Sequence, residues 1–473
     1  MTHFSDLFTR QISVKQTINV LQEWSIPLIV GVFVALLVAN VAPEAYHMLV
    51  DEPFTQWDTH FVQAEPGEGD VAHGGEDGVA HTEAHPGEAD EHIEAAGGHG
   101  GDHHGPWWEH YITLHFLIND IFMVFFFGIA AKEIVEAILP GGPLNPPSQA
   151  INPLLATIGG VVGPVGIFFV LNAIMGVPGF DSAAGEWGKG WGIPTATDIA
   201  LAWLVARIVF GAGHPAISFL LLLAVADDAI GLGIIAFGYP DPNNPTVWAN
   251  TWWIIPGMGF ALLMRLLGVR NWVPYILIGG ALSWWGLYSA HLHPALALVP
   301  IVPFLPAGTR DAGLFKEDAD YEQQEHGGHH HSPLEQFEHQ LKLPVDFGLF
   351  FFAFANAGVA FGALNNLTWI IFLSLLIGKI VGITGFGWIG IMLGAPLPVG
   401  MKVKHLFVAS MVAGIGLTVA LFVAGQAFPN GSTEMAAAKM GALFSGGICI
   451  LAVVGGLLLG VKDGGGQEVE AAE

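Results

Sequence analysis

The sequence predicts an all-α protein that crosses a membrane about twelve times. The chain has 473 residues, of which 52% are hydrophobic and only 12% charged, and its mean hydropathy is +0.55. These values are too apolar for the body of a soluble protein of this length. Apolar stretches of bilayer length recur along the chain, and the few charges inside them indicate functional sites, because intramembrane charge is costly.

The N-terminal part predicts one helix followed by an external loop. Residues 1–24 are expected on the cytoplasmic side, and the first transmembrane helix falls within 25–50, with no secretory cleavage site directly after its apolar stretch. Residues 51–105 are rich in Asp, Glu and His and contain no Lys or Arg, which predicts a disordered periplasmic loop. This loop supplies much of the formal net charge of −26, so that charge says little about the membrane core.

Residues 106–308 are predicted to contain transmembrane helices 2–8. Ordinary spans are expected at 112–139, 151–176, 191–210, 216–238 and 248–267. The stretch 272–306 is too long for one ordinary helix of its kind and is interrupted by Gly279, Gly280, Pro294 and Pro300. Two short helices fit it better than one of about 50 Å.

The C-terminal part predicts a second polar loop and four further helices. Residues 309–342 form an acidic, His-rich loop, and the spans within 343–460 are expected at 346–363, 368–392, 406–428 and 437–460. An acidic tail, 461–473, ends the chain. With twelve crossings nearly all Lys and Arg outside the spans lie on one side, which predicts that both termini are cytoplasmic; eleven crossings would scatter them.

Two adjacent aspartates, Asp227 and Asp228, lie inside the span 216–238. Each costs roughly 2.5–3.5 kcal/mol on insertion scales, so the pair indicates an ion or proton site. Adjacent helical positions differ by about 100° in direction, so the two cannot both face one partner. One is free to face a cleft while the other pairs with Lys379, the only lysine deep within an apolar span.

Two spans are predicted to be broken. Residues 191–200 place Pro194, Thr195, Thr197 and Asp198 in the middle of a helix, and residues 412–419 place Gly414, Gly416 and Thr418 there. Broken helices in corresponding halves indicate two inverted-topology repeats whose discontinuous helices cross at the bilayer midplane. Asp198 also has a simpler interpretation as a helix cap.

A series of motifs between about 110 and 460 resembles the NhaA family of sodium–proton antiporters. In order they are Ile-Asn-Asp at 118–120, Lys132-Glu133, Pro-Thr-Ala-Thr-Asp at 194–198, Ala-Asp-Asp at 226–228, His293-Pro-Ala-Leu, Ser-Pro-Leu-Glu at 332–335, Phe-Ala-Phe-Ala-Asn-Ala-Gly-Val at 352–359, Gly-Lys at 378–379 and Gly-Ile-Gly-Leu-Thr at 414–418. The chain departs from the family at Leu417, where Phe is expected. It departs again after Glu133, where Val135 and Glu136 replace basic residues and leave the cytoplasmic funnel more acidic.

The resemblance implies a role for each of these charged residues. Asp227 and Asp228 are implied to bind the transported Na⁺ and the proton, with Lys379 paired to the first aspartate. Asp198 with Thr197 is implied to offset the helix-end dipoles at the crossing of the broken helices. Asp120, Glu133 and His293 resemble supporting or pH-response residues; the alternatives are a helix-end acid, a vestibule acid and a packing histidine.

The function implied is secondary antiport. Burial and a neighbouring carboxylate favour protonation, so Na⁺ or Li⁺ and protons compete for the same oxygens. If the site opens to one side at a time, competition is enough to exchange cytoplasmic Na⁺ or Li⁺ for external H⁺. We expect electrogenic, pH-regulated exchange for sodium and pH homeostasis, in the inner membrane of a bacterium. The family also implies a homodimer in the lipid bilayer, with no enzymatic activity, cofactor or nucleic-acid partner.

The same residues bear on two other functional classes. Clustered histidines and acids bind divalent metals, so a divalent-metal or other cation transporter that uses the His-rich loops is the alternative. Against it, no two histidines lie at helical spacing with an acid inside a span, and His291 and His293 are two positions apart. A membrane-embedded aspartyl protease is disfavoured, because its two aspartates must meet from different helices to share a proton.

Overall fold

The structure is a computed structural model that describes residues 25–54, 112–140, 142, 144, 147–175, 186–239, 245–307 and 332–462. Throughout these residues the regular structure is helical, with no strand. Five helices are long and apolar enough to cross a membrane, or seven if each of two bent pairs counts as one span. The predicted class, a polytopic all-α membrane protein, is confirmed. Segment 1–24, nearly all of the 51–105 loop, residues 309–331 and residues 463–473 lie outside the described residues.

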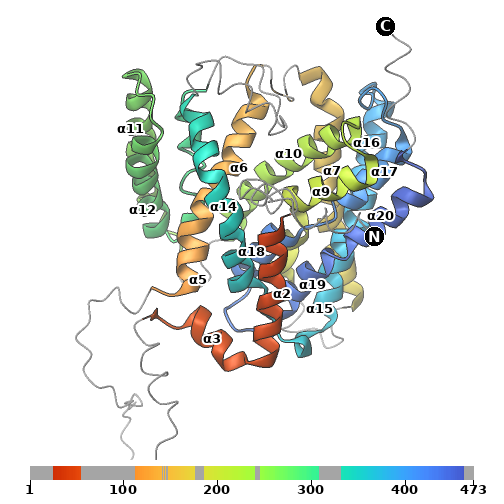
Figure 1. Cartoon of the computed structure of the whole chain (residues 1–473), viewed down its shortest axis with the longest axis horizontal. Helices are drawn as coiled ribbons and strands as arrows, with labels where there is room; N and C mark the ends of the chain where they lie inside the picture. Colours follow the sequence, from red (N-terminus) through yellow and green to blue (C-terminus); the bar gives the residue numbers. More distant parts are fainter. Residues whose placement is uncertain are drawn as a thin grey trace, which may run out of the picture.

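The first part of the chain forms two helices rather than one through 25–50. Helix α2, Ile26–Val41, ends two residues before Pro43, and α3, Pro43–Asp51, runs across the base of the molecule in Figure 1. Proline lacks a backbone N–H and restricts the residue before it, which explains the change of direction at this point.

Three long helical segments follow the predicted spans closely. Helices α5 (Leu114–Phe116), η3 (Leu117–Phe122, a π-helical turn) and α6 (Met123–Ile138) form one continuous segment. Helices α7, Pro147–Met175, and α10, Pro215–Gly238, are each unbroken.

Both predicted breaks are confirmed. The 3₁₀ helix η4, Gly188–Thr195, and α9, Ile199–Phe210, meet at 47°, and α17, Val403–Val412, meets α18, Leu417–Ala427, at 49°. Residues 196–198 and 413–416 connect the halves without helical structure.

The region 245–307 differs from its prediction. Helices η5 (Trp248–Trp253) and α11 (Ile254–Leu266) form one span-like unit, and η6 (Tyr275–Gly280) continues into α12 (Ala281–Ser289). The second short helix expected before residue 306 is replaced by the 3₁₀ turns η7 (Pro294–Leu296) and η8 (Val302–Phe304). The prolines within 294–303 remove the backbone donors that a regular helix needs.

Helix α14, Pro333–Ala357, begins well before the span predicted from residue 346, inside the segment expected to be a loop to residue 342. Ser332 and Glu335 form a capping box at its start, with Pro333 at the first helical position. The capping box therefore sets where α14 begins, and the apolar part of the helix follows further along the chain. The short turn η9, Phe361–Ala363, follows it.

The last spans are α15 (Asn366–Leu373), η10 (Ser374–Gly378, a π-helical turn) and α16 (Lys379–Met392), which are continuous, and then α17 and α18. Helices α19 (Thr433–Ser445) and α20 (Ile448–Leu458) complete the bundle. Helix α7 crosses α16 at glycines, where a Cβ added to Gly159, Gly163 or Gly382 would collide with the opposing backbone.

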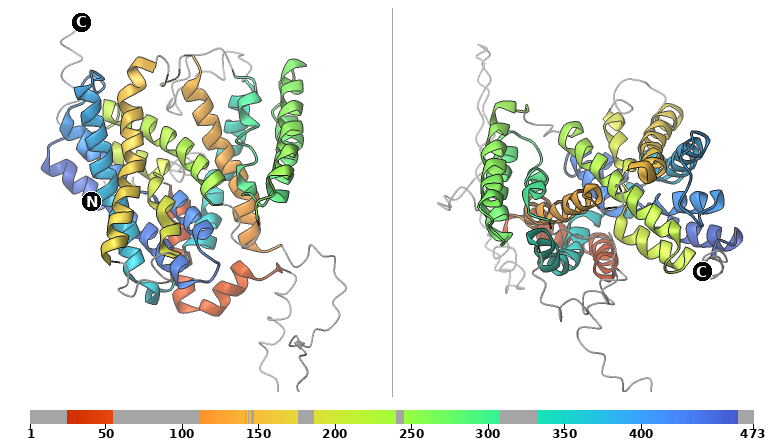
Figure 2. Two further views of the ribbon diagram at one scale, coloured as in Figure 1. Left: turned by 180° about the vertical axis from the view of Figure 1, so that it is seen from behind. Right: turned by 90° about the horizontal axis from the view of Figure 1, so that it is seen from above.

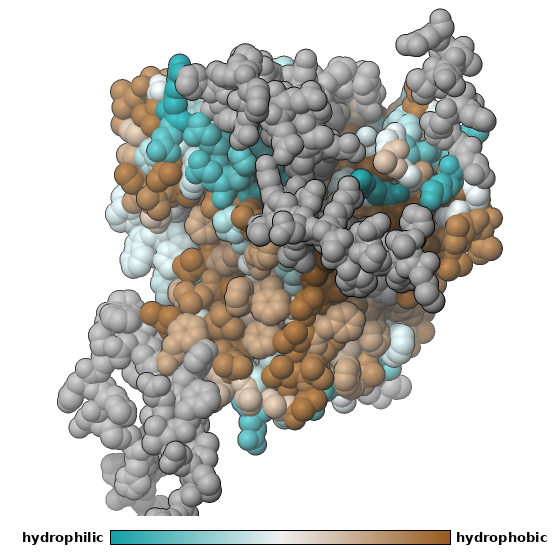
Figure 3. Space-filling model, in the orientation of Figure 1, coloured by the Kyte–Doolittle hydropathy of each residue, from teal (hydrophilic) through white to brown (hydrophobic). Residues whose placement is uncertain are grey.

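Figures 1 and 2 place α11 and α12 together at one edge of the bundle, whereas α10 and α18 lie within it. The face toward the viewer in Figure 3 is apolar through its middle and lower parts. Large apolar side chains such as Phe33, Phe351 and Leu457 are exposed on the described part of the chain. A surface of this kind suits lipid, where helices satisfy their own backbone groups.

Candidate functional site

The buried pair Asp227–Lys379 joins α10 to α16. The Nζ of Lys379 lies 2.6 Å from Oδ2 of Asp227, and neither side chain is exposed. The ammonium also donates to the carbonyl oxygen of Thr195 at 2.5 Å and to the hydroxyl of Thr197 at 3.1 Å. An ammonium has three donors, so these oxygens satisfy it completely. The structure therefore brings together the aspartate and lysine that the sequence paired.

Asp228 faces elsewhere, as the angle between neighbouring helical positions requires. It is 9% exposed and lines a pocket with residues of α6, α10 and α18: Phe127, Ala130, Gly231, Leu232, Ile235 and Val419. Oδ1 of Asp227 and Oδ1 of Asp228 are both buried and accept no hydrogen bond from any described residue. Two carboxylate oxygens with unused lone pairs are suited to accept a cation or a proton.

Asp198 lies where the two broken segments meet. Its Oδ1 accepts a hydrogen bond from the backbone N–H of Leu201 at 3.1 Å and caps α9, while its Oδ2 accepts from the N–H of Thr418 at 3.2 Å, at the start of α18. One carboxylate thus satisfies the N-termini of two half-helices, where the helix dipole favours negative charge.

The extended residues of the two breaks also bind each other directly. The N–H of Asp198 donates to the carbonyl of Ile415 at 2.7 Å, and the hydroxyl of Thr197 donates to the carbonyl of Ala413 at 2.9 Å. These bonds satisfy backbone groups that the breaks leave without helical partners. The crossing is therefore a hydrogen-bonded unit that also contacts Lys379 through Thr197.

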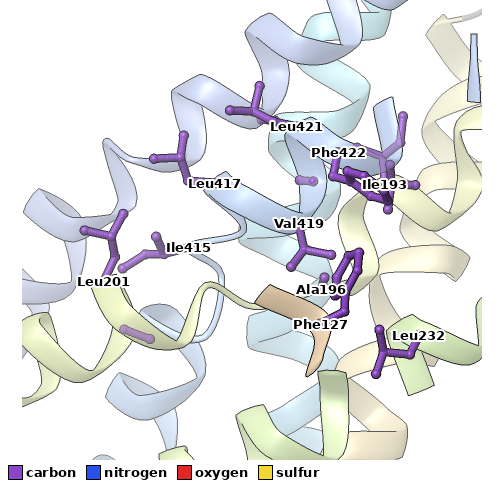
Figure 4. Close-up of a cluster of buried hydrophobic side chains, with 14 of the residues drawn as sticks. Phe127, Ile193, Ala196, Leu201, Leu232, Ile415, Leu417, Val419, Leu421 and Phe422 are labelled. Carbon is purple, nitrogen blue, oxygen red and sulfur yellow. The ribbon is translucent and has the colours of Figure 1, made fainter. Parts of the chain in front are cut away.

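An apolar cluster surrounds this crossing. Figure 4 shows Ile193, Phe127, Val419 and Phe422 around the two breaks, and the rings of Phe127 and Phe422 lie 5.2 Å apart edge to face. Exclusion of water by such a cluster strengthens the electrostatic interactions inside it and raises the cost of an unpaired charge.

The three residues expected to support the site lie outside α10 and α16, the helices that carry the two aspartates and Lys379. Asp120 is half-buried on η3, and Glu133 is half-buried on α6. The Nδ1 of His293 accepts a hydrogen bond from the N–H of Ala295 at 3.2 Å, and its ring packs 4.7 Å from that of Phe422. In the described residues none of the three forms a hydrogen bond or ion pair with the Asp227–Lys379 pair or with Asp228.

The structure adds an ion-pair cluster that the sequence did not predict. Lys132 of α6, with 6% of its side chain exposed, lies 2.6 Å from Glu136 on the same helix and also pairs with Glu338 of α14. The spacing of Lys132 and Glu136 was a usable signal, because residues four apart share a helix face. Glu136, which the sequence predicted to make the cytoplasmic funnel more acidic, is therefore paired with Lys132. Nothing in the sequence pointed to Glu338.

A buried amide pair was also missed. The side-chain N–H of Asn356 on α14 donates to Oδ1 of Asn119 on η3 at 3.0 Å, and both residues are almost fully buried. Among the described residues, no group of three or more His, Cys, Asp or Glu side chains could hold a metal ion. Most histidines of the two His-rich loops lie outside the described ranges.

This combination defines a class of protein. A bundle of membrane-crossing helices, with two broken helices meeting at a buried acid beside a buried carboxylate pair, is the architecture of secondary ion transporters.

Comparison with known proteins gives the family. A family model described as Na⁺/H⁺ antiporter 1 matches residues 101–459. The chain is 48% identical over 449 residues to the Na(+)/H(+) antiporter NhaA of Geobacter sulfurreducens, covering 95% of this chain and 99% of that protein. It is 49% identical over 451 residues to the Na(+)/H(+) antiporter NhaA of Desulfitobacterium hafniense, covering 95% and 97% of the two chains. The protein belongs to the NhaA family of Na⁺/H⁺ antiporters.

Proposed function

We propose that this protein is a secondary transporter, with no enzymatic activity and no cofactor, that exchanges cytoplasmic Na⁺ or Li⁺ for external H⁺. The observation that supports this most directly is the pair of buried aspartates, one bound to Lys379 and the other facing a pocket, each with an unused oxygen. Family membership supports the same exchange.

The exchange depends on three positive species that compete for the two carboxylates: the cation, the proton and the ammonium of Lys379. A cation that enters through the pocket meets Asp228 first, and it then competes with Lys379 for the Asp227 carboxylate. A proton on either carboxyl removes the charge that holds the cation. Na⁺ or Li⁺ loaded from one side is therefore displaced by protons from the other when the site changes its exposure.

The number of groups that can gain or lose a proton at the site sets how much charge each transport cycle moves across the membrane. Two carboxylates and one ammonium lie at the site, so more than one proton can exchange for one cation and the cycle is electrogenic. Equal numbers of protons and cations, measured in vesicles with the membrane potential clamped, would contradict electrogenic exchange.

The remaining charged residues have supporting roles in this proposal. Asp198, with Thr197, offsets the positive ends of α9 and α18 while the broken helices rearrange. Asp120, Glu133 and His293 support the site or adjust its response to pH. Control of turnover by pH follows, because acid neutralises the carboxylates on which the cation depends.

The order of the elements supports two repeats of opposite topology and about twelve crossings. A long helix, a broken span and a long segment occur in order as α7, η4 with α9, and α10, and again as α15–α16, α17 with α18, and α19–α20. We place the protein in a bacterial inner membrane as a homodimer, with both termini cytoplasmic.

The test is the collapse of a preset pH gradient in everted vesicles on addition of Na⁺ or Li⁺, between about pH 6 and 9. The wild type should respond to both cations, and Asp228→Asn should abolish the response at equal protein level. A response to Zn²⁺ with none to Na⁺ or Li⁺ would instead support the divalent-metal alternative.

A further inference from the structure

Tyr239, at the C-terminal end of α10, reaches across to the half-helix η4. The residue is 7% exposed, and its hydroxyl donates to the carbonyl of Lys189 at 2.7 Å and accepts from the N–H of Gly192 at 2.8 Å. In a regular 3₁₀ helix the N–H of a residue donates to the carbonyl three positions earlier, so Gly192 and Lys189 are natural partners. The Tyr239 hydroxyl binds both partners of one helical turn.

Gly192 and Trp191 both pack closely against the Tyr239 side chain. A Cβ added to Gly192 would lie 2.7 Å from the Tyr239 hydroxyl oxygen and 2.8 Å from its ring, so a larger residue there would displace the Tyr239 side chain. The ring of Trp191 stacks on that of Tyr239, with centroids 6.2 Å apart and planes at 21°. The hydroxyl is therefore held in one position by contacts on its ring as well as by its two hydrogen bonds.

A continuous series of hydrogen bonds leads from Tyr239 to the charged pair. The carbonyl of Gly192 accepts from the hydroxyl of Thr195 at 2.7 Å, and the carbonyl of Thr195 accepts from Lys379 at 2.5 Å. Lys379 in turn binds Asp227 on α10, the helix that ends directly before Tyr239. Helix α10 thus contacts η4 at two places, directly through Tyr239 and indirectly through Lys379.

We propose that Tyr239 is a positioning residue for cation exchange, which fixes η4 so that the Thr195 carbonyl holds the Lys379 ammonium while Asp227 binds the cation. When Asp227 exchanges its hydrogen bond to Lys379 for a cation, the ammonium keeps only the Thr195 carbonyl and the Thr197 hydroxyl. An under-satisfied buried ammonium is costly, so a displaced carbonyl makes Lys379 compete harder for Asp227. This inference rests on the proposed function.

The test is Tyr239→Phe, which removes the hydroxyl and keeps the ring. We expect the KM for Na⁺ in proteoliposomes to rise about two- to tenfold, the range set by one buried hydrogen bond, with the maximal rate little changed. Gly192→Ala should raise KM in the same direction, because its Cβ displaces the hydroxyl. The double variant should be no worse than the more affected single variant, because both changes break one contact.

Tyr288→Phe is the matched control. Tyr288 lies on α12, is 46% exposed and stacks on Trp284, outside this series of contacts. The KM of Tyr288→Phe for Na⁺ should therefore equal that of the wild type. A general loss of folded protein lowers the maximal rate and leaves KM unchanged, so it does not mimic the expected result. An unchanged KM in Tyr239→Phe, or additive effects of the two changes, overturns the inference. Absence of Na⁺-dependent exchange in the wild type rejects the proposed function itself.

Discussion

Lys379 and Asp227 form an ion pair 2.6 Å long in which neither side chain has any exposed surface. Removal of one partner from a buried pair leaves an uncompensated charge and costs about 3–5 kcal/mol, whereas loss of both partners costs much less. Lys379→Met should therefore lower the apparent melting temperature in detergent markedly. Lys379→Met combined with Asp227→Asn should recover part of the loss.

The destabilisation should also depend on pH. Protonation neutralises the Asp227 carboxyl that the single variant leaves unpaired, so the loss of melting temperature in Lys379→Met should be larger at alkaline than at acid pH. A double variant less stable than the single variant, or a loss that grows with acid, would contradict this account of the pair.

Asp198 caps two helices, so its removal should cost about twice as much as removal of an ordinary cap. Asp198→Ala leaves the N-termini of α9 and α18 unsatisfied, at about 1 kcal/mol each. Ser432→Ala is the control, because Ser432 caps only α19, through the N–H of Met435 at 3.1 Å. We expect the melting temperature to fall more for Asp198→Ala than for the control, with Asp198→Asn between Asp198→Ala and the wild type. Equal losses at positions 198 and 432 would exclude the double cap.

The all-α membrane class, the positions of most helices and both breaks were predictable from the sequence because these depend on local composition. Asp198 and the prolines and glycines near it interrupt apolar runs, and the structure breaks there. That Lys379 pairs with one of the two aspartates was predictable, because each charge lies in an otherwise apolar span and needs a partner; the resemblance implied that the partner is Asp227.

Contacts between distant polar residues could not be predicted in the same way. Glu338 lies in a region rich in acids, so nothing singled it out as the partner of Lys132. Tyr239 reads as an ordinary residue at a helix end, and only the packing of α10 against η4 gives its hydroxyl a role. The early start of α14 could not be predicted from hydropathy, because the Ser332 capping box, and not an apolar run, begins the helix.

Helix α16 carries one glycine at its close crossing with α7, Gly382, and another away from the crossing, Gly385. A Cβ on Gly382 would collide with the backbone of α7 at Gly159, whereas a Cβ on Gly385 would meet nothing within 4 Å. Gly382→Ala should therefore force α16 away from α7 and lower both the yield of folded protein and its melting temperature. Gly385→Ala should be neutral or slightly stabilising, because alanine favours helix. The comparison is made by size-exclusion chromatography and thermal unfolding in detergent; equal behaviour of the two variants would contradict the close crossing.

His214 gives a prediction about acid stability. It is 3% exposed and caps α10, where its Nδ1 accepts from the N–H of Ala216 at 3.1 Å. Its ring packs edge to face on that of His405, with centroids 4.7 Å apart, and no described residue binds its Nε2. Burial lowers the pKa of His214, because the imidazolium form loses its hydration.

Because the pKa of His214 is lowered in the folded state, acid destabilises the fold. Above the ordinary histidine pKa of about 6.5 both the folded and the unfolded states hold neutral His214, and below it the unfolded state binds the proton more readily. Stability is therefore lost as the pH falls from about 6.5 toward the lower pKa of the folded state. His214→Asn keeps an acceptor for the cap but cannot take a charge. Its melting temperature should fall less than that of the wild type between about pH 7.5 and 5.5.

The control for this prediction is His47→Asn, because His47 is exposed and its pair with Asp51 lies at the surface. An exposed pair contributes little to stability, so this variant should lose as much melting temperature on acidification as the wild type. His405, with Lys402 and Lys404 near it at the start of α17, stays in place in both variants, so the acid loss in His214→Asn should shrink without vanishing. If His214→Asn and His47→Asn lose stability equally with acid, His214 is not the residue that limits acid stability at this contact between α10 and α17.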